Sequence, residues 1–599
     1  MLPVTYYPII LEKNREWTVN LASDPVLVWW WAEKNEYNRV WSWDRPFPLW
    51  LAEQIREQIA DDAQTGKAGF SLRRLGRVLA KTARRYGWNG EGAWVPVAGA
   101  GTDQIRFPAA SAEENVTLLG TVLAKVLPGR VLTAQELGRV LARTGVKVAP
   151  YFLNLALQEL VLAGKVELVA AVGQDRWGRF YCRRCGEGER IFTEKLAGSA
   201  QPTRICYGCR ELGGLTDQTP LYRWREQPPG GALLPSPPAL VLPALTCWQA
   251  RAVKEIMAFW RRPETRTMLV WAVCGAGKTE VVFPVIQAAL AEGKRVLLTV
   301  PRREIVQELS VRVKKYFPGL AFSLLYGGHK EEVPGSLLVV ATTHQLLRFT
   351  AYFDLVIVDE ADAFPLYNNP MLNAALDRVV KPMGKQIYLT ATPDRSWRRR
   401  AARGTIAVTK IPLRHHGQPL PVPRLVRTAL PEKEDRPLPA VIRDFVLTRR
   451  AQGRKGLIFL PTVEAVEAFA ARLKKAFPRE ASYISHLHAR DPGRREKVEQ
   501  FTAGGLWLLV TTTLLERGVN FDRLDLMIIN ADQEAIFSEE TLVQIAGRVG
   551  RKADDPGGAV YFVAPKITPT MKAARQAILR MNQEGTKARS EPKPNPAGN

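Results

Sequence analysis

The chain has 599 residues, which is too long for one hydrophobic core and predicts about three to five domains. Its balance of 46% hydrophobic and 24% charged residues is typical of a globular protein and disfavours a disordered one. The 84 lysines and arginines against 59 aspartates and glutamates favour a polyanionic partner, either nucleic acid or an anionic membrane surface. Without a secretory signal or an apolar run of about 18 residues, the chain is expected to be cytoplasmic.

Residues 1–110 have no clear motif, although nine of the 16 tryptophans lie there. Aromatic side chains interleaved with arginine and lysine are able to stack on unpaired bases, but they equally form the core of a small domain. Residues 68–86 predict an amphipathic helix with a strongly basic face. Such a helix suits a nucleic-acid backbone, a membrane surface or solvent, so the role of this region stays open.

Residues 111–178 predict three helices followed by a β-hairpin. The first helix stops at Pro128-Gly129, the second opens with a capping box at Thr133–Glu136, and the third follows Pro150. Alternating residues over 166–182 then predict the hairpin. This order resembles a winged helix, a duplex-binding module, but many three-helix units bind no DNA. We therefore expect a predominantly helical N-terminal region with a winged helix as one interpretation.

Two CxxC pairs lie between residues 179 and 226. Cys182 and Cys185 form the first pair and Cys206 and Cys209 the second, with 20 residues between the pairs. This spacing allows four thiolates to close a tetrahedral Zn²⁺ site in a segment too small for its own core. No βαβ pattern typical of thioredoxin surrounds either pair, which disfavours a redox role. The sequence therefore predicts a structural zinc module.

Residues 227–244 are rich in proline and glycine and predict a linker. The chain resumes at Leu245 with LTCWQ, in which the amide of Gln249 is suited to bidentate contact with the edge of an adenine. This short pattern has weight only because a phosphate-binding sequence follows it.

The stretch MLVWAVCGAGKTE, residues 268–280, organises the rest of the chain. Its apolar run predicts a buried strand that leads into a glycine-rich turn, after which Lys278 and Thr279 open a helix. The N–H groups of such a turn cradle a β-phosphate, the lysine reaches the β and γ oxygens, and the hydroxyl ligates Mg²⁺. The residues expected to bind ATP here are Ala272, Gly275, Ala276, Gly277, Lys278, Thr279 and Glu280.

A second nucleotide motif follows a predicted strand at 355–358. The strand leads directly into Asp359-Glu360-Ala361-Asp362, and an acidic pair at such a strand end is what phosphoryl transfer requires. Asp359 is expected to hold Mg²⁺ and Glu360 to polarise the attacking water. Acidic strand-end turns are common, but a position about 80 residues after GKT favours the nucleotide motif.

A second α/β unit follows a proline-rich stretch and contains ERGVNFD at 516–522 and QIAGRVGR at 544–551. On one helix, Gln544, Arg548 and Arg551 would share a face and present two guanidinium groups to a γ-phosphate across a cleft. The predicted boundaries are 245–410 for the first unit, 411–424 for a linker, 425–565 for the second unit and 566–599 for a basic, partly disordered tail.

The ordered set LTxxQ, AxxGxGKT, PRRE, DEAD, TAT, TTTLLERG and QxxGRxGR resembles the motor of superfamily 2 helicases over residues 245–565. The resemblance implies an α/β fold with two tandem RecA-like domains. The residues it assigns to ATP hydrolysis are Lys278, Asp359, Glu360, Gln544, Arg548 and Arg551. Helicases of this type bind DNA at strand ends, which here are Pro301, Arg302, Arg303, Thr342, Thr343, His344 and Gln345.

WAVCGAGKTE, DEADAFP, RHHGQPLPVP at 414–423 and a cysteine module placed before the motor are similar to the ComFA late-competence family. The usual acidic box of that family is DEVD, so Ala361 departs from it, as does the lack of a Gly-Arg after Gly214. The resemblance implies an ATP-driven translocase on single-stranded DNA, peripheral at the inner face of the cytoplasmic membrane. Implied partners are a membrane DNA channel and a phosphoribosyltransferase-like competence protein, with homo-oligomerisation left open.

Two other functions are alternatives. A PriA-like replication-restart helicase shares the motor motifs, but proteins of that type carry their zinc cysteines inside the second lobe. A zinc and winged-helix scaffold without motor activity would not require the catalytic side chains, all of which are present. An RNA substrate is also compatible with DEAD, because this motif does not distinguish sugars.

Overall fold

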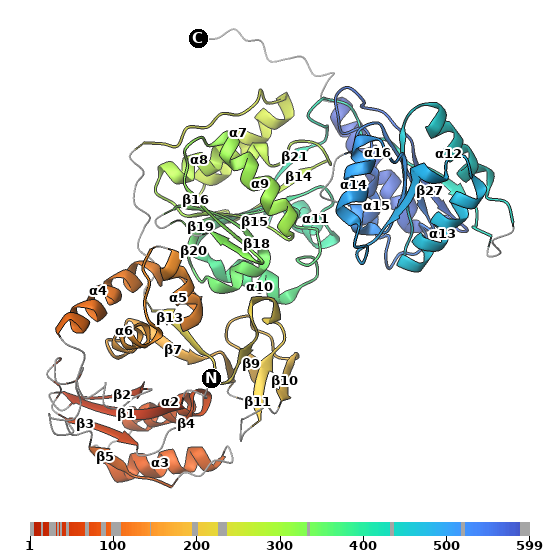
Figure 1. Cartoon of the computed structure of the whole chain (residues 1–599). Helices are drawn as coiled ribbons and strands as arrows, with labels where there is room; N and C mark the ends of the chain where they lie inside the picture. Colours follow the sequence, from red (N-terminus) through yellow and green to blue (C-terminus); the bar gives the residue numbers. More distant parts are fainter. Residues whose placement is uncertain are drawn as a thin grey trace, which may run out of the picture.

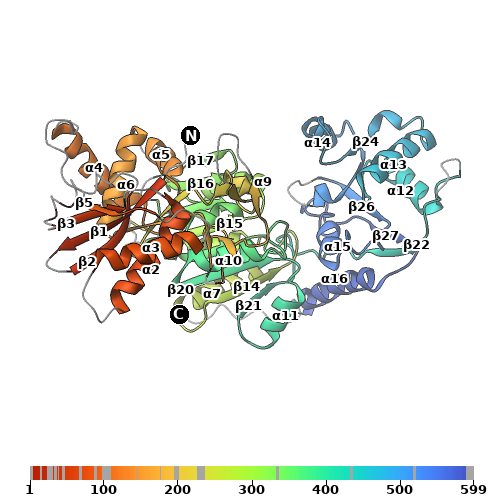
Figure 2. The same ribbon diagram turned by 90° about the horizontal axis from the view of Figure 1, so that it is seen from below.

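The computed structural model contains an N-terminal region followed by two α/β lobes (Figure 1). The N-terminal region lies against the first lobe, and the second lobe stands on the other side of the first in both views (Figure 2). The structure describes residues 5–587 except 14–15, 23–31, 33–34, 36, 38, 44–46, 66–70, 86–90, 97–109, 144, 176, 195–201, 226–235, 332, 334–335, 432–435 and 517–520. In this part of the chain, no helix is both long and apolar enough to cross a membrane.

The first 100 residues contain a sheet beside two helices, and the sequence pattern did not predict this sheet. The strands, in the sheet order β2-β1-β3-β5 with β4 beside β1, are antiparallel where they pair. Strand β1 has buried side chains on both faces: Ile10 joins the core under the helices, and Ile9 and Leu11 join a second cluster. It therefore shows no apolar–polar alternation. The elements are β1 (Thr5–Lys13), β2 (Glu16–Ala22), β3 (Arg39–Trp43), β4 (Phe47–Pro48), α2 (Leu49–Thr65), α3 (Leu72–Arg85) and β5 (Trp94–Pro96).

The hairpin predicted over residues 166–182 forms only in part. Strands β8 and β9 pair with each other, but β7 pairs with β13, which lies after the cysteine segment. The three-stranded sheet β6-β13-β7 packs beside three helices, and a winged helix stays a prediction. The elements are α4 (Ala110–Val126), β6 (Val131–Leu132), α5 (Ala134–Arg143), α6 (Pro150–Leu162), β7 (Val166–Ala170), β8 (Val172–Gln174), β9 (Phe180–Cys182) and β13 (Pro220–Trp224).

The cysteine segment forms a small antiparallel sheet in the order β10-β11-β12. Its buried cysteines belong to an apolar cluster that also contains Leu346, Leu347 and Phe349 of the first lobe. The cysteine segment therefore packs directly against lobe 1 of the motor. Its elements are β10 (Ile191–Glu194), β11 (Thr203–Cys206), η1 (Arg210–Leu212) and β12 (Leu215–Thr216).

Lobe 1 is an eight-stranded sheet in the order β17-β16-β18-β15-β19-β20-β14-β21, parallel except for β17. Its strands are buried on both faces, which explains their continuous apolar runs. The strands are β14 (Thr267–Ala272), β15 (Val296–Val300), β16 (Phe322–Tyr326), β17 (His329–Glu331), β18 (Leu338–Thr342), β19 (Phe353–Val358), β20 (Val380–Thr390) and β21 (Ala407–Ile411). The helices are α7 (Cys247–Arg261), η2 (Glu280–Val282), α8 (Phe283–Ala291), α9 (Arg303–Tyr316), η3 (Thr343–Arg348), α10 (Pro370–Val379) and α11 (Arg395–Ala402).

Lobe 2 is a six-stranded parallel sheet in the order β22-β27-β26-β23-β25-β24. Most of the segment expected to be a basic tail is instead α16, whose Met571, Ala574 and Ile578 are buried. The elements are β22 (Arg424–Arg427), α12 (Ala440–Ala451), β23 (Lys455–Phe459), α13 (Val463–Ala476), η4 (Ala481–Tyr483), β24 (Ile484–Leu487), α14 (Arg494–Ala503), β25 (Leu508–Thr511), η5 (Thr513–Glu516), β26 (Leu524–Ile529), α15 (Glu539–Ala546), β27 (Val560–Ala564) and α16 (Pro569–Lys587).

Candidate nucleotide site and cysteine cluster

The glycine-rich turn follows β14, an inner strand of lobe 1. Gly275 and Gly277 have φ angles of +79° and +70°, a region that side chains other than glycine adopt with strain. A Cβ on Gly277 would also lie 2.3 Å from Nε2 of Gln249. The helix expected at Lys278 starts slightly later, as the 3₁₀ turn η2 followed by α8. The turn thus has the backbone that a phosphate-binding loop needs.

Two side chains of this loop face the acidic motif. Oγ1 of Thr279 donates to Oδ2 of Asp359 at 3.0 Å, and Nζ of Lys278 lies 3.6 Å from Oδ1 of the same carboxylate. Burial acts to lower the pKa of Lys278, but the charges of the acidic motif outweigh burial and hold this pKa above its usual value. Lys278 therefore stays an ammonium, and an oxygen pair suited to Mg²⁺ lies beside it.

Glu360 occupies a strained position directly after Asp359. Its φ angle is +53°, and its N–H donates to Oδ1 of Asp359 at 2.8 Å. Non-glycine residues in this region are uncommon and concentrate at functional sites. The turn aims the Glu360 carboxyl into the same cavity that Lys278 and Thr279 line.

Gln249 lies next to the loop, but both ends of its amide already have partners in the chain. Its Oε1 accepts from the N–H of Thr246 at 2.9 Å, and its Nε2 donates to the carbonyl of Ala276 at 3.0 Å. Thr246 and Gln249 form a capping box at the start of α7. In this structure the residue expected to read adenine therefore fixes the phosphate loop.

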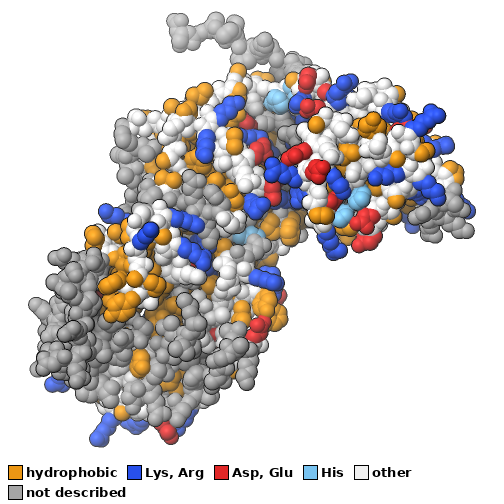
Figure 3. Space-filling view, viewed as in Figure 1, with side chains coloured by type: hydrophobic (Ala, Val, Ile, Leu, Met, Phe, Trp, Pro, Cys, Tyr) orange, Lys and Arg blue, Asp and Glu red, His pale blue; other side chains and the backbone are white. Residues whose placement is uncertain are grey.

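Lobe 2 reaches this site through Gln544 of α15. Its Nε2 donates to Oδ2 of Asp362 at 2.9 Å, and its Oε1 accepts from Sγ of Cys274 at 3.1 Å. Thr392, in the TAT motif of lobe 1, also donates to Asp362. One glutamine thus joins the second lobe to three motifs of the first, and in Figure 3 acidic and basic side chains gather where the lobes meet.

The two arginines after Gln544 do not share a helix with it, which corrects the expectation from their spacing. Helix α15 ends at Ala546, and Arg548 and Arg551 lie in the turns that follow. Arg548 is 2% exposed, whereas Arg551 lines the cavity, and its Cγ lies 3.9 Å from the position of a Cβ on Gly275. Of the two, Arg551 is the one placed beside the phosphate loop.

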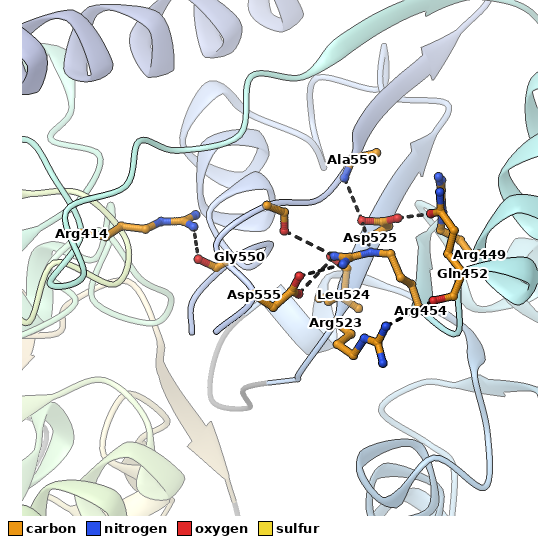
Figure 4. Close-up of polar contacts among 11 residues, drawn as sticks. Arg414, Arg449, Gln452, Arg454, Arg523, Leu524, Asp525, Gly550, Asp555 and Ala559 are labelled. Carbon is orange, nitrogen blue, oxygen red and sulfur yellow. Dashed lines mark hydrogen bonds and ion pairs between the residues drawn. The ribbon is translucent and has the colours of Figure 1, made fainter. Parts of the chain in front are cut away.

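Partly buried ion pairs and a buried hydrogen bond hold the turn that carries Arg551 on both sides (Figure 4). On one side, Arg414 donates to the carbonyl of Gly550. On the other, Nη1 of Arg454 lies 2.7 Å from Asp555, and Arg454 also pairs with the buried Asp525. The position of Arg551 is therefore set from both the interlobe segment and the core of lobe 2.

Residues 411–424 are more than the linker that the sequence predicts. Arg414 is 1% exposed, and burial lowers its pKa to about 10. The next residue, His415, uses both its N–H and its Nδ1 on the carbonyl of Gly275, at 3.1 and 3.0 Å. Nε2 of His416 lies 3.2 Å from the carbonyl of Gly550. The segment thus bridges the phosphate loop and the arginine turn, a role that only its place in the fold reveals.

The phosphate loop, Asp359, Glu360, His415, Gln544 and Arg551 line a cavity of about 640 Å³. Its lining also contains Glu280, Arg312 and Tyr316, with Nη1 of Arg312 lying 3.3 Å from Oε1 of Glu280. Arg312 and Tyr316 belong to no motif, so sequence reasoning had no signal by which to select them. A cavity with one ammonium, guanidinium groups and an acidic pair at a glycine-rich loop suits a nucleoside triphosphate with Mg²⁺.

The predicted DNA-binding residues follow two adjacent parallel strands. Val300 of β15 pairs in register with Thr342 of β18, so the segments after these strands lie side by side at one edge of the sheet. Pro301, Thr342, Thr343 and Gln345 are buried there. Arg302 and His344 are partly exposed and Arg303 is fully exposed, so the accessible side chains are these three. Of the ERGVNFD motif, residues 517–520 lie outside the described part of the chain.

The four predicted zinc ligands come together in a buried cluster. Their Sγ atoms lie within 4.8 Å of one another, with 3.7 Å between Cys182 and Cys209 and 3.5 Å between Cys185 and Cys206. A tetrahedron of thiolates about 2.3 Å from Zn²⁺ has edges of about 3.8 Å, whereas a disulfide needs about 2.05 Å. The donor set and its spacing therefore fit zinc.

The arginines beside these cysteines have structural partners. Nη2 of Arg184 lies 2.8 Å from Oε2 of Glu136 on α5, and Nη2 of Arg348 in η3 lies 2.9 Å from Oε1 of the same carboxylate. Burial acts to raise the pKa of Glu136, but the two guanidinium groups outweigh burial and lower it. Since η3 directly follows Thr342, this buried triad connects the helical region and the cysteine cluster to a predicted DNA-binding segment.

The motor lobes match two known families. The DEAD/DEAH box helicase family matches residues 246–400, and the helicase conserved C-terminal domain matches residues 438–553. The chain is 27% identical to ATP-dependent DNA helicase RecG of Synechocystis sp. over 350 residues, 54% of this chain and 40% of that protein. Both lobes are therefore helicase domains of an ATP-hydrolysing enzyme.

Two competence proteins are more similar to this chain than the RecG helicase is. The chain is 37% identical to competence protein ComFA of Bacillus subtilis over 411 residues, which is 68% of this chain and 87% of that protein. It is 36% identical to competence protein ComFA of Streptococcus pneumoniae over 318 residues, 53% of this chain and 72% of that protein. The chain therefore belongs to the ComFA family of competence proteins, as a helicase-like, ATP-dependent DNA-processing enzyme.

Proposed function

We propose that this protein is an ATP-driven translocase on single-stranded DNA that works in the uptake of transforming DNA. In this proposal it acts at the inner face of the cytoplasmic membrane, beside a DNA channel and a phosphoribosyltransferase-like competence protein. Membership of the ComFA family favours this role over that of a PriA-like restart helicase. The matched helicase families argue against a scaffold without motor activity.

The observation that carries the proposal is the contact of both lobes with one nucleotide cavity. Lys278, Thr279 and Asp359 of lobe 1 would bind the phosphates and Mg²⁺, and Glu360 would orient the attacking water. Arg551 of lobe 2 would stabilise the charge that develops on the γ-phosphate. Because this residue comes from the other lobe, binding and hydrolysis of ATP would change the spacing of the lobes.

A change in lobe spacing moves DNA only if each lobe holds the strand. In lobe 1 the accessible Arg302, Arg303 and His344 lie at one edge of the sheet, as described above. In lobe 2 we propose the segment after Leu460 as the counterpart, since it follows β23 at the equivalent edge. Contacts to phosphates would allow the motor to accept any sequence.

The direct test of translocation is displacement of streptavidin from an end-biotinylated oligonucleotide. We expect release to be faster with ATP than with a non-hydrolysable analogue, and ATPase activity to rise when single-stranded DNA is added. The same release rate with both nucleotides would refute a translocase. Parallel ATPase measurements with duplex DNA and RNA, at a stated salt concentration, identify the substrate.

Substitution of Arg302 and Arg303 by alanine should weaken the stimulation of ATPase activity by DNA. Removing two phosphate contacts should raise the DNA concentration for half-maximal stimulation about tenfold, with nucleotide affinity nearly unchanged. Lys314 and Lys315, two exposed cations at the other end of α9, are the matched control pair. An equal effect of both double variants would attribute the loss to general charge and contradict the assignment.

We also propose that Cys182, Cys185, Cys206 and Cys209 hold one structural Zn²⁺. Purified protein should contain about one zinc ion per chain by elemental analysis, and a Cys182→Ser/Cys206→Ser variant should contain none. Loss of the metal should make residues 180–212 sensitive to protease, because these turns have few apolar contacts of their own. The motor lobes, with their own cores, should stay folded.

The control for the zinc measurement is Cys247→Ser, which removes an exposed cysteine outside the cluster. This variant should keep its zinc. A full zinc content in the Cys182→Ser/Cys206→Ser variant would show that the metal lies elsewhere.

A further inference from the structure

The N-terminal region contains an open groove of about 1030 Å³ that the proposed motor does not use. It is formed by helix α3, by strands β3 and β5, and by residues 91–93 just before β5. In Figure 1 this part of the molecule lies at the end of the N-terminal region that is farthest from lobe 2. Neither of the two helicase families extends to it, since their matches begin at residues 246 and 438.

One side of the groove is a row of cations on α3. Arg73, Arg77, Lys81 and Arg84 are all exposed and line the groove, at positions i, i+4, i+8 and i+11 of the helix. This spacing places them on one face, with neighbours about 4.5 to 6 Å apart along the axis. Within the part of the chain that the structure describes, none of the four is in an ion pair. Glu91 is the one acidic residue in the described lining.

The other side of the groove is aromatic. The rings of Trp43 and Trp94 meet edge to face with centroids 5.3 Å apart, and Trp94 is partly exposed. Gly76 of α3 faces them: a Cβ there would lie 3.4 Å from Trp43 and 3.6 Å from Trp94, so no side chain intervenes. Neither indole N–H has an acceptor among the described residues. Unsatisfied buried donors of this kind call for an explanation, and a ligand-binding role is one.

We propose that this groove binds single-stranded DNA, with phosphates along the cations of α3 and a base stacked against Trp94. Cations beside an aromatic platform are the combination with which proteins bind unpaired strands irrespective of sequence. A duplex would keep its bases stacked on one another and away from Trp94. The groove is therefore a second DNA contact, outside the motor lobes.

A membrane surface is the other polyanion to consider, and the orientation of α3 argues against it. A helix that lies in a membrane interface needs an exposed apolar face. The apolar residues of α3, among them Leu75, Leu79 and Ala83, are instead buried in the core of the N-terminal region. Only its basic face is exposed, which suits a phosphate backbone.

A second contact on the same strand would keep DNA bound while the motor lobes release it. When two sites engage one strand, rebinding of either becomes intramolecular, and overall affinity exceeds that of each site. The inference rests on binding and does not require movement. Its test is made without ATP, so a failure of translocation leaves it standing.

The test is the affinity of the full chain for a fluorescein-labelled oligothymidylate, measured by anisotropy at several salt concentrations. The Arg73→Ala/Arg77→Ala/Lys81→Ala variant should bind at least about tenfold more weakly at low salt. The slope of log affinity against log salt should fall by about 2, since each phosphate contact of a single strand contributes about 0.7. Trp94→Phe should retain affinity, because it preserves a stacking ring.

The matched control removes three exposed cations in the last turn of α13 and just after it: Lys474, Lys475 and Arg479. Its slope and affinity should stay those of the unmodified protein. The groove substitutions should weaken binding further in the Arg302→Ala/Arg303→Ala background, which separates this site from the motor. An unchanged salt slope would overturn the proposal. So would a groove variant that loses binding to phosphatidylglycerol vesicles while its affinity for the oligonucleotide is unchanged.

Discussion

Glu360→Gln should bind ATP normally and hydrolyse it about 10²–10⁴-fold more slowly, the range typical of losing a general base. The amide has the shape of the carboxylate and keeps the strained turn, in which the N–H of residue 360 donates to Asp359. Lys278, Thr279 and Asp359 would be untouched, so the phosphate and Mg²⁺ contacts should persist. Steady-state ATPase assays and titration with a fluorescent ATP analogue measure the two properties separately.

Two further variants make this result specific. Lys278→Ala should weaken nucleotide binding as well as turnover, because it removes the ammonium that faces the phosphates. Glu292→Gln should change neither, since this carboxylate accepts from the indole of Trp260 at the surface of lobe 1. Normal turnover by Glu360→Gln would contradict the role of Glu360 in orienting the attacking water.

Arg551→Ala should lower the ATPase rate by about 10³-fold or more, as expected for an arginine that stabilises phosphoryl transfer from a neighbouring domain. Arg551 lines the cavity, and its turn is held in place through Gly550 and Asp555 on either side. Arg551→Lys should recover little, because an ammonium lacks the planar fork of donors. Nucleotide affinity should change much less than turnover, since the loop of lobe 1 makes most phosphate contacts.

The control is the next residue, Lys552, whose ammonium pairs with Asp522 at the surface and does not line the cavity. Lys552→Ala should therefore keep its ATPase activity. A large loss in Lys552→Ala would attribute the effect of Arg551→Ala to a disturbed turn. Full activity of Arg551→Ala would mean that the second lobe supplies no arginine to the reaction.

The buried triad of Glu136, Arg184 and Arg348 connects the N-terminal region to lobe 1 of the motor. Removing one partner of such a network leaves a buried charge without compensation, which is strongly destabilising. The helical region, the cysteine cluster and η3 should therefore behave as one unit. Loss of zinc would then disturb the sheet edge at Thr342 as well as the cysteine turns.

Local sequence sufficed for the parts of the site that lie within one strand–turn segment. The apolar run before Gly275, the acidic pair after β19 and the two CxxC pairs each contain their chemistry within about a dozen residues. Parallel strands that are buried on both faces have continuous apolar runs in the sequence. The strands of the two lobes could therefore also be predicted. The clustering of Cys182, Cys185, Cys206 and Cys209 followed from their spacing alone, because four thiolates at such spacing close one tetrahedron.

The tertiary structure decided whatever depends on contacts between distant segments. The stretch that begins with Arg414 and His415 indicated only a family resemblance, yet the fold brings these residues to Gly550 and Gly275, more than a hundred residues away in each direction. Spacing placed Arg551 on a helix with Gln544, but α15 ends at Ala546 and residues 547–550 form turns. In the N-terminal region, the side chains of β1 are buried on both faces of the sheet. Its sequence therefore lacks the apolar–polar alternation by which a strand is predicted. The sequence also did not indicate what the basic face of α3 contacts. Trp43 and Trp94 pack against Gly76, and this packing makes the basic face one side of a groove.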